Sequence, residues 1–242
     1  MSTGLVISCE HASAAIPAPL RGDFLDAGDA LRSHRGSDIG ALALARRTAA
    51  SLGASLHATR VSRLVVDTNR SLSSRSLFSP WTRDLPRDDR QRLLARFWYP
   101  YRASVCEAIE QALKSHDRVL HWSVHSFTPV FDGVVRDVDI GLLYDPARHD
   151  EKAFAARYRQ VLTALDASLR IAMNRPYRGS ADGFTRFLRT RFHAASYAGI
   201  ELEVSQRFPL EGGPRWRRLQ AHLIEALRTC IAPVSSRRRS MS

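Results

Sequence analysis

The chain has 242 residues, of which 44% are apolar and 25% charged, values typical of a soluble protein with one large domain. No apolar run reaches the roughly 20 residues of a membrane-spanning helix, which excludes a membrane protein. Three cysteines are too few for a disulfide framework, which excludes a small secreted scaffold and favours the reducing cytoplasm. The net charge of +12 comes mostly from arginines spread along the chain, which favours small anionic ligands over nucleic acid as partners.

The first third of the chain alternates apolar strand patterns with a helical pattern. Residues 5–9 predict a buried strand, and residues 38–52 predict a helix that Asp38 caps and Gly53 ends. A polar segment rich in Ser, Arg and Pro follows and precedes the next helical pattern. Before that segment, two further strands are expected over 54–60 and 63–67.

The longest helical pattern lies over residues 87–115, where apolar side chains recur on one face and Pro100 should kink or split the helix. Further strands are expected over 119–124, 138–144, 171–173 and 200–204. Further helices are expected over 150–168, 184–192 and 214–230. No linker divides residues 1–232, which we expect to form one domain, and the basic Ser/Arg-rich residues 233–242 are expected to be a disordered tail.

This alternation of strands and helices predicts an α/β domain with three layers, α/β/α, around a mostly parallel sheet. Ligands bind such sheets outside the carboxyl ends of the strands. Polar groups follow several predicted strands at those ends, namely Glu10-His11, Asp67 with Asn69 and Arg70, His125-Ser126, and Glu201 with Glu203. The sequence therefore predicts a binding or catalytic site at this edge of the sheet.

Two histidines at strand ends indicate a metal site. A catalytic zinc ion takes three ligands from His, Asp and Glu and leaves one position for water. His11 and His125 each follow an apolar strand, although either one alone can equally be a loop histidine bonded to backbone. Glu10 and Asp38 compete as the carboxylate ligand, and Asp38 also fits a helix cap. His34 is a further candidate, either as a ligand or as a residue that supports one.

Glu201 and Glu203 lie two residues apart in one predicted strand, so their side chains point to the same face. Two carboxylates on one buried face cost free energy unless they line a cleft or meet a cation. Either one can act as the general base that activates water. The alternative is an edge strand with a solvated acidic face.

Other polar groups suit an anionic ligand. Arg70 and Asn69 can bind a carboxylate, which a planar guanidinium does through two parallel hydrogen bonds, unless Arg70 pairs with Asp67 instead. The segment 174–177, Asn-Arg-Pro-Tyr, is either a loop over the pocket mouth or a plain turn. Ser126 can donate a hydrogen bond to substrate or can order the loop around its neighbour.

Six segments of the chain carry most of these residues: Ile7–Ser13 with Ile16-Pro17, Ser37–Ala41, Ser62–Arg70, Val124–Pro129, Asn174–Tyr177 and Glu201–Val204. In this order they resemble the N-formylglutamate amidohydrolase family. The resemblance implies a fold like that of the zinc carboxypeptidases, with a mixed sheet. It also implies hydrolysis of N-formyl-L-glutamate to formate and glutamate, in histidine breakdown. The chain departs from the best-characterised members in placing Glu10 before the first histidine and in being short.

Carried over residue by residue, the resemblance implies three ligands for one zinc ion, or for another divalent metal: His11, Asp38 and His125. Asp38 is preferred to Glu10 because the Asp-x-Gly-Ala segment matches the family better. Glu203 matches the late-strand glutamate of the family and is the expected general base, with Arg63 near the carbonyl under attack. The expected contacts to a small anionic N-acyl amino acid are Asn69, Arg70, Ser126, Asn174 and Tyr177.

Two alternatives stay open from the sequence. The same residues can serve another N-acyl amino-acid deacylase or a carboxypeptidase-like metallohydrolase. A basic binding protein can also keep the fold without the chemistry, and its metal content would distinguish it from an enzyme.

Overall fold

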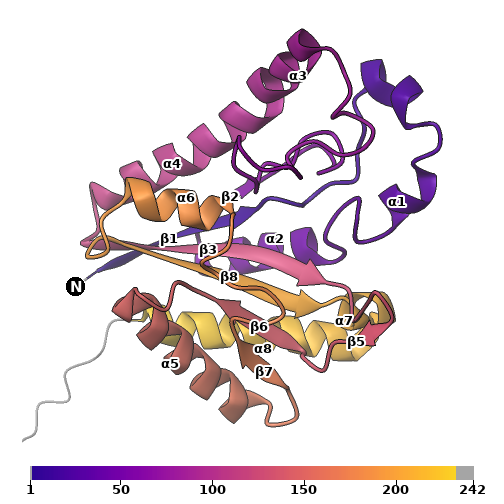
Figure 1. The fold of residues 1–242 in the computed structure, drawn as a ribbon. Helices are drawn as coiled ribbons and strands as arrows, with labels where there is room; N and C mark the ends of the chain where they lie inside the picture. The colour runs from indigo at the N-terminus through magenta and orange to yellow at the C-terminus, as the bar shows by residue number, and fades with distance from the viewer. Residues whose placement is uncertain (1, 233–242) are drawn as a thin grey trace, which may run out of the picture.

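A six-stranded sheet forms the centre of the computed structural model, which describes residues 2–232. The strand order is β2-β1-β3-β8-β6-β7, so strands far apart in the sequence lie side by side (Figure 1). The expected tail, residues 233–242, lies outside the described residues. The strands are β1 (Thr3–Cys9), β2 (Ser55–Ala58), β3 (Arg118–Phe127), β6 (Ile140–Leu143), β7 (Ile171–Met173) and β8 (Tyr197–Ser205).

The sheet is mixed and mostly parallel. Strands β2, β1, β3 and β8 run parallel to one another, whereas β6 pairs antiparallel with β8 and parallel with β7. The predicted fold class is therefore confirmed. Because β1, β3 and β8 are parallel neighbours, their carboxyl ends meet at one edge of the sheet, where α/β proteins bind ligands.

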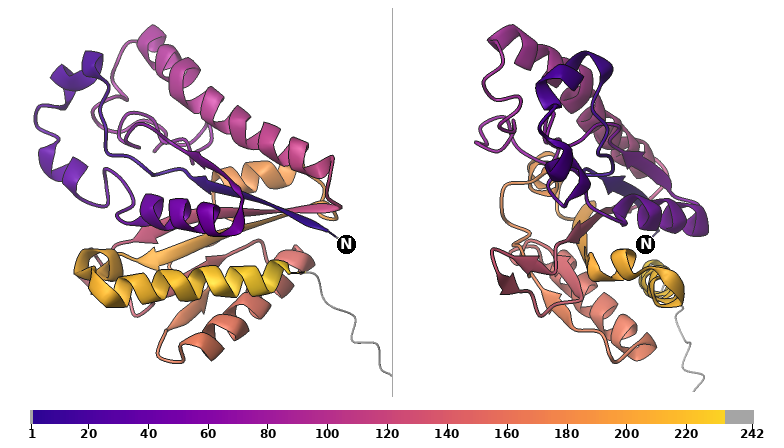
Figure 2. Two further views of the ribbon diagram at one scale, coloured as in Figure 1. Left: turned by 180° about the vertical axis from the view of Figure 1, so that it is seen from behind. Right: turned by 90° about the vertical axis from the view of Figure 1, so that its right-hand side faces the viewer.

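Helices cover both faces of the sheet and complete the three layers (Figures 1 and 2). The main hydrophobic core joins one face to α2 (Ala41–Leu52), α5 (His149–Leu165) and α8 (Gly213–Ile231). A second hydrophobic cluster joins the other face to α4 (Tyr99–Leu113) and α6 (Phe184–Arg191). None of the helices within the described residues combines the length and apolarity that a bilayer crossing needs.

The long helix predicted over 87–115 consists of three consecutive segments. These are α3 (Arg87–Leu93), a π-helical turn (Leu94–Trp98) and α4. Pro100 lies in the first turn of α4, where it lacks an N–H and where its ring crowds the preceding turn. A wider π turn is one way for a helix to absorb such a disruption without ending. Pro100 therefore interrupts the regular helix, as predicted, but does not break it.

The strand predicted over 63–67 is wrong, because residues 63–65 form a turn and residues 66–67 have no regular structure. Val65 and Val66 are nevertheless buried, since they pack into a third hydrophobic cluster with Phe24 and Trp98. This cluster anchors the loop-rich segments of the first third of the chain to the start of the long helix. An apolar run buried in a turn has the same sequence pattern as a short buried strand, so periodicity alone could not separate the two.

The structure also contains short elements that the sequence did not predict. The hairpin formed by β4 and β5 directly follows β3, and it turns at Asp132 and Gly133, which both have positive φ (49° and 77°). This hairpin lies beyond the same strand end as His125. The short elements are η1 (Ala18–Phe24), α1 (Gly28–Arg32), β4 (Val130–Phe131), β5 (Val134–Val135) and α7 (Arg207–Glu211).

Candidate active site

A pocket of about 180 Å³ lies where β1, β3 and β8 reach their carboxyl ends. The residues expected to bind the metal, to act in catalysis or to contact substrate all line it except Asn174, whereas Glu10 and Asp67 do not line it. The loop that contains Arg63 and Arg70 and the segment 177–183 complete the wall. Residues predicted at separate strand ends thus meet in one cavity.

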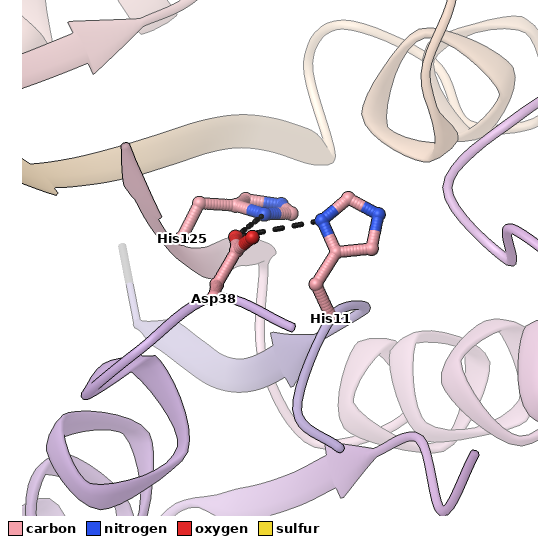
Figure 3. A group of neighbouring side chains, drawn as sticks. All are labelled: His11, Asp38 and His125. Carbon is pink, nitrogen blue, oxygen red and sulfur yellow. Dashed lines mark hydrogen bonds and ion pairs between the residues drawn. The ribbon is translucent and has the colours of Figure 1, made fainter. Parts of the chain in front are cut away.

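Three buried side chains point toward one another in this pocket: His11, Asp38 and His125 (Figure 3). One ligand atom from each lies within 4.8 Å of the other two. Oδ2 of Asp38 is 2.9 Å from Nδ1 of His125 and 3.4 Å from Nδ1 of His11. His11 directly follows β1, His125 lies near the end of β3, and Asp38 comes from the turn before α2. The three residues are therefore brought together from separate parts of the sheet edge.

The far ring nitrogen of each histidine contacts a second buried carboxylate. Nε2 of His11 is 2.8 Å from Oδ1 of Asp67, and Nε2 of His125 is 3.0 Å from Oε2 of Glu10. Carboxylates in this position fix the orientation and tautomer of imidazoles that bind metals. Of the two carboxylates that competed in the sequence, Asp38 lies within the group of three and Glu10 lies behind His125.

The prediction that Asp38 caps α2 is wrong. Gly40 occupies the N-cap position with φ of 83°, and no side chain caps the helix. The Asp38 carboxylate instead accepts hydrogen bonds from Nδ1 of His125 (2.9 Å) and from the backbone N–H of Ser126 (3.2 Å). A Cβ atom at Gly40 would lie 2.4 Å from Pro209, so this turn requires glycine for space as well as for its backbone angle. The turn directs Asp38 into the pocket.

The charges of this group depend on one another. Burial opposes ionisation of Asp38, but the neighbouring His11 and His125 hold its pKa well below the usual value. Burial also disfavours a charged His125, but its hydrogen bonds to Asp38 and Glu10 outweigh burial and raise its pKa well above the usual value. A metal ion that binds Nδ1 of His125 would therefore displace a proton.

The donor set fits a divalent metal ion. Nδ1 of His11 is buried and has no hydrogen-bond partner within residues 2–232, which is unusual for a buried polar atom. Two imidazoles with one carboxylate suit zinc and also iron or manganese. The group of His11, Asp38 and His125 could therefore bind such an ion. His34 lines the same pocket but lies outside this group.

Glu201 and Glu203 both line the pocket from β8, but their surroundings differ. Glu201 accepts a short hydrogen bond from the hydroxyl of Thr185. Oε2 of Glu203 is buried with no hydrogen-bond partner in the described part of the chain. Burial raises the pKa of Glu203 to about 8, with His125 opposing the shift and Asp38 adding to it. Of the two carboxyl groups, Glu203 is thus the one free to exchange a proton.

Two arginines share Asp67 on one side of the pocket. Nη2 of Arg63 donates to Oδ2 of Asp67 at 2.9 Å, and its Nη1 is 3.7 Å from Oδ1 of Asp38. Nε of Arg70 is 3.9 Å from the same Asp67 oxygen, while its Nη1 donates to the backbone carbonyl of Asp182 at 2.6 Å. The local Asp67–Arg70 pair considered from the sequence is therefore long, and Arg63 is the closer partner.

The remaining predicted contacts lie in different places. Asn174 stands outside the pocket wall, where its side-chain oxygen accepts hydrogen bonds from the backbone N–H groups of Tyr144 (3.1 Å) and Gly179 (3.0 Å) and thereby shapes the loop. Ser126 lines the pocket, but its hydroxyl donates to a backbone carbonyl at 2.8 Å. Tyr177 is 44% exposed at the pocket, and its hydroxyl accepts a hydrogen bond from Arg136.

Sequence analysis missed several residues that hold this site in place. Asp67 was predicted at a strand end and as a possible partner of Arg70, but its contact with His11 was not predicted. Thr185 holds Glu201, and Gln206 donates to the Ser126 hydroxyl at 3.1 Å. No local pattern marks these residues, because each acts through a contact between segments distant in the sequence.

The chain is similar to known proteins over most of its length. A profile of the family described as N-formylglutamate amidohydrolase matches residues 3–208, which is most of the chain. The chain belongs to the N-formylglutamate amidohydrolase family. The resemblance carried by the six sequence segments is therefore confirmed.

Known proteins that resemble this chain differ in their sequence identity to it. The N-formylglutamate deformylase of Pseudomonas aeruginosa is 28% identical to this chain over 191 residues. The match covers 65% of this chain and 65% of the length of that curated relative. Gene product Atu2144 of Agrobacterium tumefaciens is 30% identical, with a TM-score of 0.77 over 93% of this chain and 90% of that one. The N-formylglutamate amidohydrolase of Ralstonia eutropha JMP134 shares the fold, with a TM-score of 0.70 at 19% identity over 95% and 93% of the two chains.

Proposed function

We propose that this pocket hydrolyses the amide bond of a small N-formyl amino acid, with N-formyl-L-glutamate as the preferred substrate and one zinc ion as cofactor. The observation that carries the proposal is the buried group of His11, Asp38 and His125 beside the unpartnered carboxyl group of Glu203, in a chain of the N-formylglutamate amidohydrolase family. Metal-assisted hydrolysis needs both parts, a metal site and a group that can move a proton.

His11, Asp38 and His125 are the residues that would hold the ion. When bound, zinc polarises a carbonyl group and activates water for attack at neutral pH. Asp67 and Glu10 keep the two imidazoles oriented through their far nitrogens. The burial of the whole group keeps competing water away from these charges, which strengthens their interactions.

Glu203 is the proposed general base. Its buried Oε2 takes a proton from water while the water oxygen attacks the formyl carbon. The same carboxyl group then donates this proton to the amide nitrogen as the C–N bond breaks, which releases formate and the free amino acid. The metal-free pKa of Glu203, raised to about 8 by burial, would fall beside a divalent cation, which favours the ionised form.

Arg63 is placed to stabilise the negative charge that develops on the carbonyl oxygen. Its guanidinium group lines the pocket and lies against the carboxylates of Asp67 and Asp38. These two contacts hold the guanidinium in place before substrate arrives. Donors that are fixed in advance contribute most to stabilising a transition state because they need no reorganisation during the reaction.

Arg70 and Asn69 are proposed to bind the α-carboxylate of the substrate. Nε of Arg70 is buried without a hydrogen-bond partner in the described residues, while its Nη1 is anchored to Asp182. Oδ1 of Asn69 accepts the backbone N–H of Phe184 at 2.8 Å, which leaves the amide nitrogen to donate to a ligand. A guanidinium and an adjacent amide donor together suit a carboxylate.

Tyr177 is the remaining proposed substrate contact, whereas Ser126 and Asn174 support the pocket wall. The Tyr177 hydroxyl accepts from Arg136, so its own proton can be donated to the side-chain carboxylate of the substrate. The Ser126 hydroxyl is already committed to the backbone of Ile39, so we assign it the ordering of the wall beside His125. Asn174 contributes indirectly, because it orders the loop that carries Tyr177.

The test combines metal analysis of the purified chain with hydrolysis of N-formyl and N-acetyl derivatives of glutamate, glutamine and a neutral amino acid. We expect about one zinc ion per chain, loss of activity on chelation, recovery on adding zinc back, and fastest turnover of N-formyl-L-glutamate. A metal-containing chain that prefers N-acetyl substrates would be a different deacylase. A chain with neither stoichiometric metal nor activity would instead be a binding protein.

A further inference from the structure

Glu10 is a fully buried carboxylate that the proposed reaction does not use directly. It lies directly after β1 and before His11, with 1% of its surface exposed. Its Oε1 accepts a hydrogen bond from the Tyr101 hydroxyl at 2.9 Å. Its Oε2 accepts one from the Ser123 hydroxyl at 2.6 Å and lies 3.0 Å from Nε2 of His125. Both carboxylate oxygens are therefore held in fixed positions.

The surrounding hydrogen bonds determine which nitrogen of His125 carries a proton. Ser123 has one hydroxyl proton, and it donates this proton to Glu10 because an ionised carboxylate can only accept. The Ser123 oxygen, 2.9 Å from Nε2 of His125, must then accept from that nitrogen. Two acceptors thus converge on Nε2, which keeps its proton. Nδ1, which donates its proton to Asp38, is consequently the nitrogen at which a metal ion would displace a proton and use the lone pair.

The two carboxylates behind the histidines carry different effective charges. Asp67, behind His11, is paired with Arg63 at 2.9 Å and lies near Arg70. Among the described residues, Glu10 forms an ion pair within 4.0 Å only with His125, and Arg102 interacts with its charge from farther away. A buried carboxylate without an arginine at short range acts more strongly on its neighbours than one that is paired. Glu10 therefore exerts the stronger electrostatic effect on the metal-binding group.

The backbone of Glu10 is held as firmly as its side chain. Its carbonyl oxygen accepts hydrogen bonds from the hydroxyls of Thr59 (2.9 Å) and Thr68 (3.2 Å). Both contacts come from segments outside β1. A carboxylate fixed at its side chain and at its backbone cannot follow His125 if the ring turns, so it holds the ring in one orientation.

We propose that Glu10 is a positioning residue for metal binding: it holds the proton on Nε2 of His125, presents Nδ1 to the ion, and supplies a negative charge that no arginine pairs with at short range. This inference rests on the proposed metal-dependent function of the same pocket. Supporting residues of this kind typically change metal affinity by 10- to 100-fold when they are replaced. Because Glu10 has no arginine at short range whereas Asp67 pairs with Arg63, we expect Glu10 toward the upper end of that range and Asp67 toward the lower end.

The test is the zinc dissociation constant of the full chain, measured by competition with a chromophoric chelator at fixed pH. Glu10→Gln keeps the shape of the side chain and removes its charge, and we expect zinc to bind about 10- to 100-fold more weakly. Glu151→Gln is the matched control, because Glu151 is also fully buried but lies in α5 and pairs with Arg189 of α6. We expect this control to lower thermal stability and to leave zinc affinity within about threefold, since a remote site couples little to the metal group.

The outcomes separate the positioning role from the proposed function. If the wild-type chain binds zinc and Glu10→Gln binds it equally well, the positioning role is overturned while the metal-dependent function stands. The same holds if Glu151→Gln weakens zinc as much as Glu10→Gln does, because the effect then reports general loss of structure. If the wild-type chain binds no metal, the proposed function fails and the role of Glu10 fails with it.

A second measurement needs no Glu10 variant and applies even if Glu10→Gln does not fold. Long-range proton–nitrogen NMR spectra of the zinc-loaded wild-type chain distinguish the two ring nitrogens of His125. We expect the proton on Nε2, protected from exchange with solvent, and the metal on Nδ1. A proton on Nδ1 would overturn the proposal.

Discussion

His121 and His125 lie four residues apart on β3, so their side chains point to the same face of the sheet. Both are buried, with 0% and 2% of their surfaces exposed. His121 contacts the hydroxyls of Ser8 at 2.7 Å and Tyr197 at 2.9 Å, whereas His125 lies between two carboxylates. One strand therefore carries two buried histidines in opposite electrostatic surroundings.

The difference between these two regions shows what makes a buried histidine a candidate ligand. Burial lowers the pKa of His121 to about 4, because no hydrogen-bonded carboxylate offsets the loss of water. The carboxylates around His125 outweigh the same burial penalty and raise its pKa. An excess of buried negative charge is what a dication can neutralise. Burial is common to both sites, and the neighbouring charges decide their roles.

The largest expected effect separates the two histidines directly. His125→Ala and His11→Ala should each abolish stoichiometric metal binding, because each removes one of three ligands. His121→Ala should keep the metal while it lowers stability through a cavity in the core. Metal analysis of each purified variant, with circular dichroism to establish folding, checks this. Full metal occupancy in His125→Ala or His11→Ala would remove that residue from the ligand set.

The next largest effect is expected for the two glutamates of β8, which differ as the two histidines do. Glu203→Gln should keep the metal and lower turnover by about 10²- to 10⁴-fold, the usual contribution of a general base. Glu201→Gln is the matched control, because the Glu201 carboxylate already accepts a hydrogen bond from the Thr185 hydroxyl. The turnover of this variant should fall much less. Steady-state kinetics with metal analysis checks both variants. A larger loss in Glu201→Gln would exchange the two roles.

Much of this arrangement could be predicted from the sequence because strand ends are local features. The apolar runs before His11 and His125 mark two strands, and their alternation with helices indicates that the strands are parallel. The two-residue spacing of Glu201 and Glu203 fixes their common face. Parallel strands then bring their carboxyl ends to one edge, so most of the candidate site follows from patterns of a few residues.

The parts that could not be predicted depend on contacts between distant segments. Asp38 precedes a helix, where a capping role and a site role look identical in the sequence, and only its contact with His125 distinguishes them. Asp67 belongs to a buried turn that resembles a strand, and nothing local points to its contact with His11. Asn174 lies in a loop whose path depends on Tyr144 and Gly179. Hydrogen bonds across the fold leave no periodic signal.

Arg70 tests whether the pocket mouth also depends on specific charge pairs. If Arg70 binds the α-carboxylate, Arg70→Ala should cost about 2–4 kcal/mol in kcat/KM, the scale for losing one partner of a desolvated charge pair. Arg70→Lys should recover only part of this, because an ammonium group cannot make two parallel hydrogen bonds. Kinetics on N-formyl-L-glutamate and on its α-amide measures the effect, and the loss should vanish on the amide.

The comparison of acid and amide substrates also identifies the alternative role of Arg70. Its Nη1 holds the backbone carbonyl of Asp182, so the side chain can also act by ordering that loop. An Arg70→Ala enzyme that is equally impaired on both substrates would show that this loop contact dominates. The proposed carboxylate clamp would then be wrong, while the metal group and Glu203 would be unaffected.

The smallest expected effect concerns His121 and the pH dependence of stability. Its pKa in the fold is about 4, below the ordinary value of 6.5, so the folded chain resists protonation that the unfolded chain accepts. The stabilisation from neutral His121 is thus complete above about pH 6.5 and is lost as the pH falls toward 4.

The full pKa shift corresponds to about 3 kcal/mol, and we expect a loss of about 1–3 kcal/mol in the free energy of unfolding. Denaturant unfolding of the metal-free chain between pH 7 and 4 measures this loss, with His121→Asn as the comparison. The variant keeps the site carboxylates, whose lowered pKa values in the fold also reduce stability as the unfolded chain takes up protons, so this contribution is common to both proteins. The wild type should lose more free energy of unfolding than the variant over this range. Parallel curves would show that His121 keeps an ordinary pKa, and the contrast between the two histidines of β3 would then rest on contacts alone.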